Sequence, residues 1–108
     1  MKKLLLILMM GSFTGLNTAK AWWVTGPGAL SCGEVISNTK EYPVVMKDIY
    51  LSWMQGYISG LNYGLDSNKG KINDHDAIWY AVMNRCHEKP LTDFYEAIFW
   101  VYDNELTE

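Results

Sequence analysis

Three groups of residues carry side chains suited to chemistry, and two of them are candidate cation sites. The loop that begins at Asp66 starts like a calcium-binding loop, but its glycine, Gly70, stands at the fifth position rather than the sixth, and Ala77 stands where a bidentate Glu is needed. Residues 74–76 place a histidine between two aspartates, yet consecutive residues of a helix point about 100° apart and cannot close on one ion. We therefore expect no metal and no cofactor, and interpret residues 74–76 as the start of a helix.

The third group is the adjacent pair Cys86 and His87. A cysteine–histidine nucleophile would need a free thiol, which a disulfide removes. His87 falls in the last turn of a predicted helix, where a cation is favoured without any catalytic task. The acidic residues are otherwise scattered, and no glycine loop of the phosphate-binding kind is present. We expect no enzymatic activity.

The first 21 residues predict a secretory signal peptide. Lys2 and Lys3 give a positive start, residues 4–10 form an unbroken apolar run, and Ala19-Lys20-Ala21 is a small-x-small cleavage site. The apolar run is too short to span a bilayer, although a retained anchor is the alternative. We expect cleavage after Ala21, export to the periplasm, and a single mature domain over 22–108 that begins with an extended lead over 22–30.

The charge of the mature chain disfavours two classes of partner. Loss of Lys2, Lys3 and Lys20 with the signal leaves six basic residues against twelve acidic ones, a net charge of −6. No run of basic residues is present, so neither nucleic acid nor, once the signal is removed, an anionic membrane is an expected partner.

The two cysteines, Cys32 and Cys86, are expected to form one disulfide. Two cysteines in a small exported chain most simply pair with each other, while two free thiols or a metal site are the alternatives. They stand 54 positions apart in the sequence. Closing a loop of that length contributes roughly 4 kcal/mol in the chain-entropy estimate, with measured values from about 0 to 5. The bond could therefore supply much of the stability of so small a domain.

Four helices are predicted after the lead, and each has a recognisable start. The expected ranges are 32–38, 43–64, 74–88 and 93–106. Ser31 and Glu34 fit a capping box, and Pro43 suits the first position of a helix because its missing N–H is not needed there. Asn73 and Thr92 are the predicted caps of the last two helices. The result is one all-α domain.

The helix predicted over 43–64 carries the most informative pattern. Trp53 and Tyr57 lie on one side, and Gly56 and Gly60 lie on another, so the helix is apolar or small nearly all round, which is typical of a buried central helix. An interior glycine costs about 1 kcal/mol relative to alanine. We therefore expect another helix to pack closely against Gly56 and Gly60, with a functional groove beside Tyr57 as the alternative.

Aromatic residues are unusually frequent, with five Trp and seven Tyr in the chain, all after residue 21. Most of these rings are expected to fill the core. Rings that do not fit inside would form an adhesive surface, and exposed apolar patches mark partner sites.

A family resemblance follows from a small set of motifs. They are Cys32-Gly33-Glu34-Val35-Ile36, Trp53-x-x-Gly56-Tyr57-x-x-Gly60, Asn84-Arg85-Cys86 and Pro90. The pattern resembles the HdeA/HdeB-like group of small periplasmic proteins. It is also similar to the related immunity proteins that protect the periplasm against amidase toxins delivered by type VI secretion. The match spans most of residues 31–106.

The resemblance implies a small four-helix orthogonal bundle whose single disulfide ties the first helix to the third. It implies a non-catalytic protein that binds other proteins, either unfolded periplasmic clients or a toxin. In the HdeA/HdeB-like chaperones acid dissociates a homodimer and exposes apolar surface. Neutralising twelve carboxylates would take this chain from −6 to about +8, which suits an acid-stress chaperone. An immunity protein with one tight toxin partner is the alternative.

Overall fold

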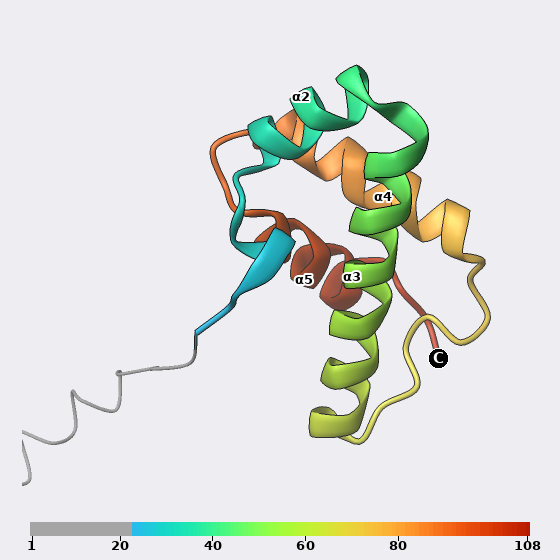
Figure 1. The fold of residues 1–108 in the computed structure, drawn as a ribbon. Coiled ribbons are helices and arrows are strands. Elements are labelled where there is room, and N and C mark those ends of the chain that lie inside the picture. The colour runs from blue at the N-terminus through green and yellow to red at the C-terminus, as the bar shows by residue number, and fades with distance from the viewer. Residues whose placement is uncertain (1–22) are drawn as a thin grey trace, which may run out of the picture.

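The chain folds into four α-helices and one short 3-10 helix in the computed structural model, which describes residues 23–108 (Figure 1). The elements in chain order are η1 (Gly26–Ala29), α2 (Cys32–Glu41), α3 (Pro43–Leu65), α4 (His75–Glu88) and α5 (Phe94–Asn104). The described part has no strand, so the predicted all-α, four-helix fold is confirmed. The predicted signal peptide, its cleavage site and Trp22 lie outside the described residues.

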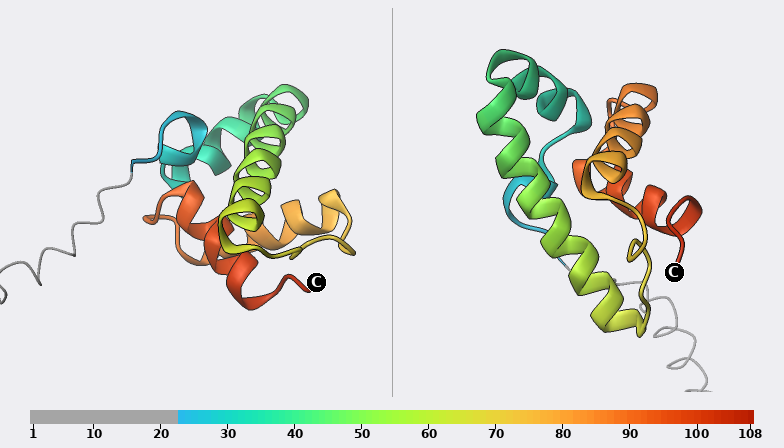
Figure 2. Two further views of the ribbon diagram at one scale, coloured as in Figure 1. Left: turned by 90° about the horizontal axis from the view of Figure 1, so that it is seen from below. Right: turned by 90° about the vertical axis from the view of Figure 1, so that its right-hand side faces the viewer.

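The helices pack around one core, and α3 passes the other helices at steep angles (Figure 2). The core draws on α2, α3, α4 and α5 and on the tail that follows α5. Its members are Cys32, Val35, Tyr50, Met54, Ile58, Ile78, Trp79, Val82, Cys86, Phe94, Ala97, Ile98, Val101, Tyr102 and Leu106. Cys32 and Cys86 are fully buried in this core and bonded to each other, so the predicted disulfide joins α2 to α4.

Local side-chain chemistry sets the start of α2 and α3 as predicted. The backbone N–H of Glu34 donates to Ser31 Oγ at 3.1 Å, and the Ser31 N–H donates to Glu34 Oε1 at 3.0 Å, which completes a capping box. Pro43 occupies the first position of α3. The α2 helix runs to Glu41, three residues beyond the predicted end, and the single residue Tyr42 separates it from α3.

The predicted cap of α4, Asn73, is wrong by one residue. Asp74 caps this helix instead, because its Oδ1 accepts the N–H of Ala77 at 2.7 Å. Asn73 serves the C-terminal tail, where its Oδ1 accepts the N–H of Thr107 at 3.4 Å. A carboxylate also complements the positive end of the helix dipole better than an amide does.

The predicted cap of α5, Thr92, is also wrong by one residue. Asp93 is the cap, and its N–H donates to Glu96 Oε1 at 2.9 Å in a second capping box. The Thr92 hydroxyl donates to the carbonyl of Lys89 at 2.8 Å and so belongs to the preceding turn. A glutamate three residues after Asp93 decides between the two candidates.

The lead is not simply extended, because residues 26–29 form one 3-10 turn that packs on α3. Gly26 has a φ of +81°, a conformation that glycine adopts readily. The carbonyl of Leu30 accepts the N–H of Phe94 at 2.8 Å, and the N–H of Cys32 donates to the Thr92 carbonyl at 2.8 Å. These bonds hold the lead and α5 side by side.

The prediction that α3 is buried nearly all round is wrong. Only Tyr50, Met54 and Ile58 of this helix are buried, whereas Tyr63 is 92% exposed and Leu65 is 60% exposed. A helix of 23 residues is about 34 Å long, which exceeds what the shorter neighbours cover. Its C-terminal half therefore extends past the bundle, as the lower end of α3 in Figure 1 shows. Over residues 23–108 no helix is both long and apolar enough to cross a membrane.

Candidate functional site

A groove of about 1000 Å³ lies beside α5, between the C-terminal half of α3 and the end of α4. Its lining is mainly apolar and comes from all three of these helices. The lining residues are Gly56, Tyr57, Gly60, Leu61, Leu65, Arg85, Thr92, Tyr95, Glu96, Ala97, Phe99, Trp100, Asp103 and Asn104. We call this feature the α3–α5 groove. Exposed apolar side chains such as Leu65 and Phe99 make it open to solvent.

The two singled-out glycines, Gly56 and Gly60, lie in this groove and not at a helix–helix contact. A Cβ atom added at either position, or at Gly64 one turn later, would meet no atom of the described part of the chain within 4 Å. The prediction of close intramolecular packing at these glycines is therefore wrong. The core helices contact α3 on the side of Met54 and Ile58, which leaves the glycine side uncovered.

The other two singled-out residues, Trp53 and Tyr57, stack on each other, but each ring also contacts a different part of the chain. Their ring centroids are 5.2 Å apart with an interplanar angle of 20°. Trp53 packs against the lead, because Gly28 lies directly on its ring. Tyr57 points one turn further along, where the edge-on ring of Tyr95 lies 6.4 Å away. Trp53 is thus a packing residue, and Tyr57 lines the groove.

The two tyrosines that line the groove, Tyr57 and Tyr95, both have a raised pKa. Burial raises the pKa of Tyr57 above its ordinary value of 10, and the neighbouring Tyr95 raises it further. Burial also raises the pKa of Tyr95, and the charges of Glu96 and Asp93 add to the effect. Both side chains therefore present neutral hydroxyl groups on an otherwise apolar wall.

Among the described residues, Arg85 is the one cation that lines the groove, and its charge is already engaged. Its guanidinium carbon lies 4.1 Å from the ring centroid of Trp100, a cation–π contact. Its Nη1 lies 3.6 Å from Glu88 Oε1. The stacking holds the Trp100 ring against the end of α4, and so fixes that side of the groove.

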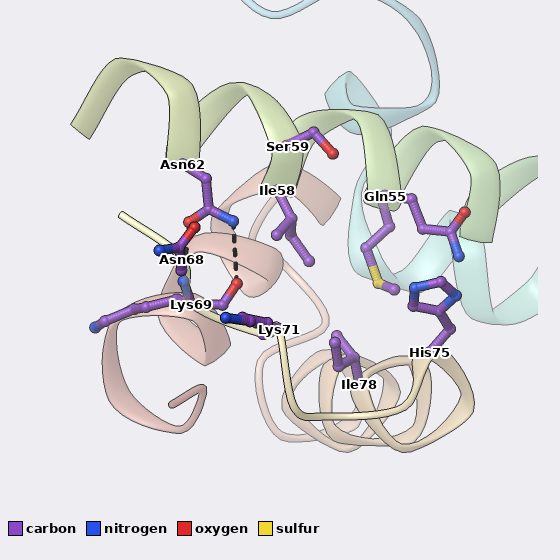
Figure 3. Close-up of a pocket in the computed structure, with 11 residues that line it drawn as sticks. Gln55, Ile58, Ser59, Asn62, Asn68, Lys69, Lys71, His75 and Ile78 are labelled. Atoms are coloured by element: carbon purple, nitrogen blue, oxygen red, sulfur yellow. Dashed lines mark hydrogen bonds between the residues drawn. The ribbon is translucent and has the colours of Figure 1, made fainter. Parts of the chain in front are cut away.

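A smaller pocket of about 190 Å³ lies between α3, the 66–74 loop and the start of α4 (Figure 3). Gln55 and His75 lie at one end of it and Asn62 at the other (Figure 3). The Asn62 side chain donates to the carbonyl of Lys69 at 3.1 Å and accepts the Lys69 N–H at 3.1 Å. The hydroxyl of Tyr102 donates to the same Asn62 oxygen at 2.8 Å. The polar groups at this end hold the loop onto the bundle.

Lys69 does not direct its charge into the smaller pocket. Its Nζ donates to the carbonyl oxygens of Tyr102 and Asp103, at 3.3 and 3.4 Å, and lies 5.4 Å from the ring centroid of Tyr102. The lysine therefore caps the negative C-terminal end of α5. The polar groups at the Asn62 end of the smaller pocket therefore join the 66–74 loop to α3 and α5.

Sequence reasoning did not identify the α5 side of the groove. Tyr95 and Phe99 stand four residues apart on a face distinct from the buried Phe94 and Ile98. Two apolar faces on one short helix were the available signal, because a small core can cover only one of them. The predicted surplus of rings is present: Phe99 is 41% exposed and Trp23, in the lead, is 85% exposed.

The α3–α5 groove is mainly an apolar surface. Within residues 23–108 no cluster of three His, Cys, Asp or Glu side chains is placed to hold a metal ion. Both cysteines of the chain are bonded to each other. The groove itself presents apolar rings, two hydroxyl groups and acidic edges. Comparisons of the chain with protein-family models, curated proteins and solved structures found no match.

Proposed function

We propose that the protein is a non-catalytic, exported protein of the periplasm that acts by binding another protein in the α3–α5 groove. The observation that carries this proposal is the groove itself, an open and mainly apolar hollow of about 1000 Å³ in the folded domain. Exposed apolar surface of this kind is typical of protein-interaction sites, in which aromatic residues and arginine are enriched. Tyr57, Phe99 and Trp100 supply the rings.

The uncovered glycines support an external partner. Interior helix glycines cost about 1 kcal/mol each relative to alanine, and within residues 23–108 no atom lies close enough to gain from their missing side chains. A partner that approaches the α3 backbone at Gly56 and Gly60 would gain from them.

The shape of the groove favours one defined partner. Its walls are helices fixed by the core, by the stacked Trp53 and Tyr57 rings and by the Arg85–Trp100 contact. A preorganised surface loses little entropy on binding and therefore suits a tight complex. Inhibition of a periplasmic toxin, for example an amidase delivered by type VI secretion, is the corresponding role.

An acid-stress chaperone is the second candidate, and the helix caps favour it. Carboxylates at Glu34, Asp74 and Glu96 accept backbone N–H groups at the starts of three helices. Protonation would weaken these charge-assisted bonds while the Cys32–Cys86 bond still tied α2 to α4. The loosened chain would then offer its apolar residues to unfolding clients.

Site-specific photocross-linking in the periplasm tests the groove as the binding surface. A photoreactive phenylalanine analogue at Leu61 or Phe99 should give a discrete adduct with another protein. The same analogue at Ile72 or Tyr80, which are exposed but outside the groove, is the matched control and should give none. Equal adducts at all four positions, or adducts at the control positions alone, would contradict the proposal.

A further inference from the structure

Acidic residues predominate among the charges that border the α3–α5 groove. From Ile49 to Asn68, α3 and the turn after it contain one acid, Asp66, and no Lys or Arg. From Leu91 to Glu108, α5 and its flanks contain five acids and again no Lys or Arg. Of the two cations nearby, Arg85 is paired with Glu88 and stacked on Trp100. The other, Lys69, donates to the carbonyl oxygens at the end of α5. The groove therefore has an apolar lining and negative edges.

We propose that the occupant of this groove is an amphipathic α-helix of another protein, with small and apolar residues toward the groove and Lys or Arg along its flanks. This inference rests on the proposed function and adds the chemical class of the partner. Helix-in-groove binding is a common mode of peptide recognition, and complementary charges at the rim add specificity and speed of association.

The dimensions of the site fit a short helix. From Gly56 to Leu65 the exposed side of α3 runs about 14 Å, which is between two and three helical turns. Over this length Gly56, Gly60 and Gly64 present backbone only, so a second helix axis could approach closely. Tyr57 and Phe99 would contact its apolar face, and Glu96 and Asp103 its basic flanks.

Other occupants fit the charges less well. A second copy of this chain would bring its own excess of acids against Glu96 and Asp103, and like charges oppose each other across an interface. An anionic membrane surface would be repelled for the same reason. A small ligand is a poorer fit, because small-molecule pockets bury most of the ligand, whereas this groove is open along the exposed Leu65 and Phe99.

Two synthetic helical peptides of equal length provide the test. Both carry leucine and alanine on one face, and the other face carries lysine in the first peptide and glutamate in the second. Titration followed by tryptophan fluorescence should show the lysine peptide binding at least about tenfold more tightly. Gly60→Leu, which places a side chain in the groove, should weaken its binding by about tenfold or more.

Matched charge variants separate the rim from the overall charge of the protein. Glu96→Gln with Asp103→Asn should weaken binding of the lysine peptide by about threefold to tenfold, and glutamine still supports the α5 cap. Glu41→Gln with Asp48→Asn removes the same charge near the α2–α3 junction and should leave the affinity unchanged. An equal loss in both double variants would mean unspecific attraction and would overturn the inference.

The remaining outcomes separate this inference from the proposed function. If both peptides bind equally well and Gly60→Leu weakens both, the basic class of partner is wrong, while the groove stands as a binding site. If Gly60→Leu has no effect on either peptide, the groove is not their site and the inference fails. Self-association in sedimentation that Gly60→Leu abolishes would instead identify a second copy as the occupant and overturn the inference.

Discussion

The indole ring of Trp53 lies directly against Gly28, so that a Cβ atom at position 28 would overlap the six-membered ring. This contact joins the lead to α3 and stands beside the Trp53–Tyr57 stack that leads to the groove. Gly28 is buried although it lies outside the four α-helices. The lead therefore packs over the Trp53 end of the Trp53–Tyr57 stack on α3.

Gly28→Ala should destabilise the domain, because either the lead or the Trp53 ring must move. Overpacking of this kind lowers the free energy of unfolding by about 1–3 kcal/mol. Urea denaturation followed by circular dichroism measures the change. Gly33→Ala is the matched control, since a Cβ there would make an ordinary 3.5 Å contact with the Pro90 carbonyl. Equal stability of Gly28→Ala and the parent protein would contradict the packing described.

Gly60→Ala should have the opposite effect on stability. The position is helical and the space beside it is open, so alanine should raise the free energy of unfolding by about 1 kcal/mol. Thermal unfolding of the variant checks this expectation, and Gly56→Ala should behave alike. A loss of stability would mean that the glycines are in a close contact within the folded protein.

Reduction of the Cys32–Cys86 bond should weaken the fold. The chain-entropy estimate for a closed loop of this length is about 4 kcal/mol, within a measured range of about 0 to 5. Mass spectrometry of the unreduced protein should show two hydrogens fewer than the reduced chain. Denaturation with and without reductant then gives the stability change. Two titratable thiols in the native protein would contradict the bond.

Alkaline pH should destabilise the domain through Tyr57 and Tyr95. Their pKa values are raised in the folded state, so their contribution to stability is complete below the ordinary value of 10 and is lost as pH rises through the folded values. Unfolding free energies measured across this range should fall, and tyrosinate absorbance should show two late-titrating groups. The decrease in the free energy of unfolding should be smaller in Tyr57→Phe. An identical decrease in this variant would mean that other groups cause the effect.

Acid pH tests the chaperone candidate. Carboxyl groups as a class ordinarily titrate near pH 4, so a pH of about 2–3 removes most of the negative charge of a protein. The domain should then bind a hydrophobic dye and slow the aggregation of acid-unfolded proteins. A protein that stays dye-silent and protects no client at that pH is not an acid chaperone, and the single-partner role would lead.

The local part of this structure was predictable from the sequence because it depends on neighbours in the chain. Ser31 with Glu34 predicts the start of α2, and Pro43 predicts the start of α3. The caps of α4 and α5, Asp74 and Asp93, each lie one residue after the predicted cap. The number of cysteines and the signal pattern predicted one disulfide, since Cys32 had a single candidate partner in Cys86.

The tertiary structure alone decided which faces of the helices are covered. Helical periodicity groups Gly56 with Gly60 and Tyr95 with Phe99, but it contains no information on what lies opposite each group. That depends on contacts between residues far apart in sequence, such as the packing of Gly28 on Trp53. Because the core takes only one face of α3 and one of α5, the other faces remain open and form the groove.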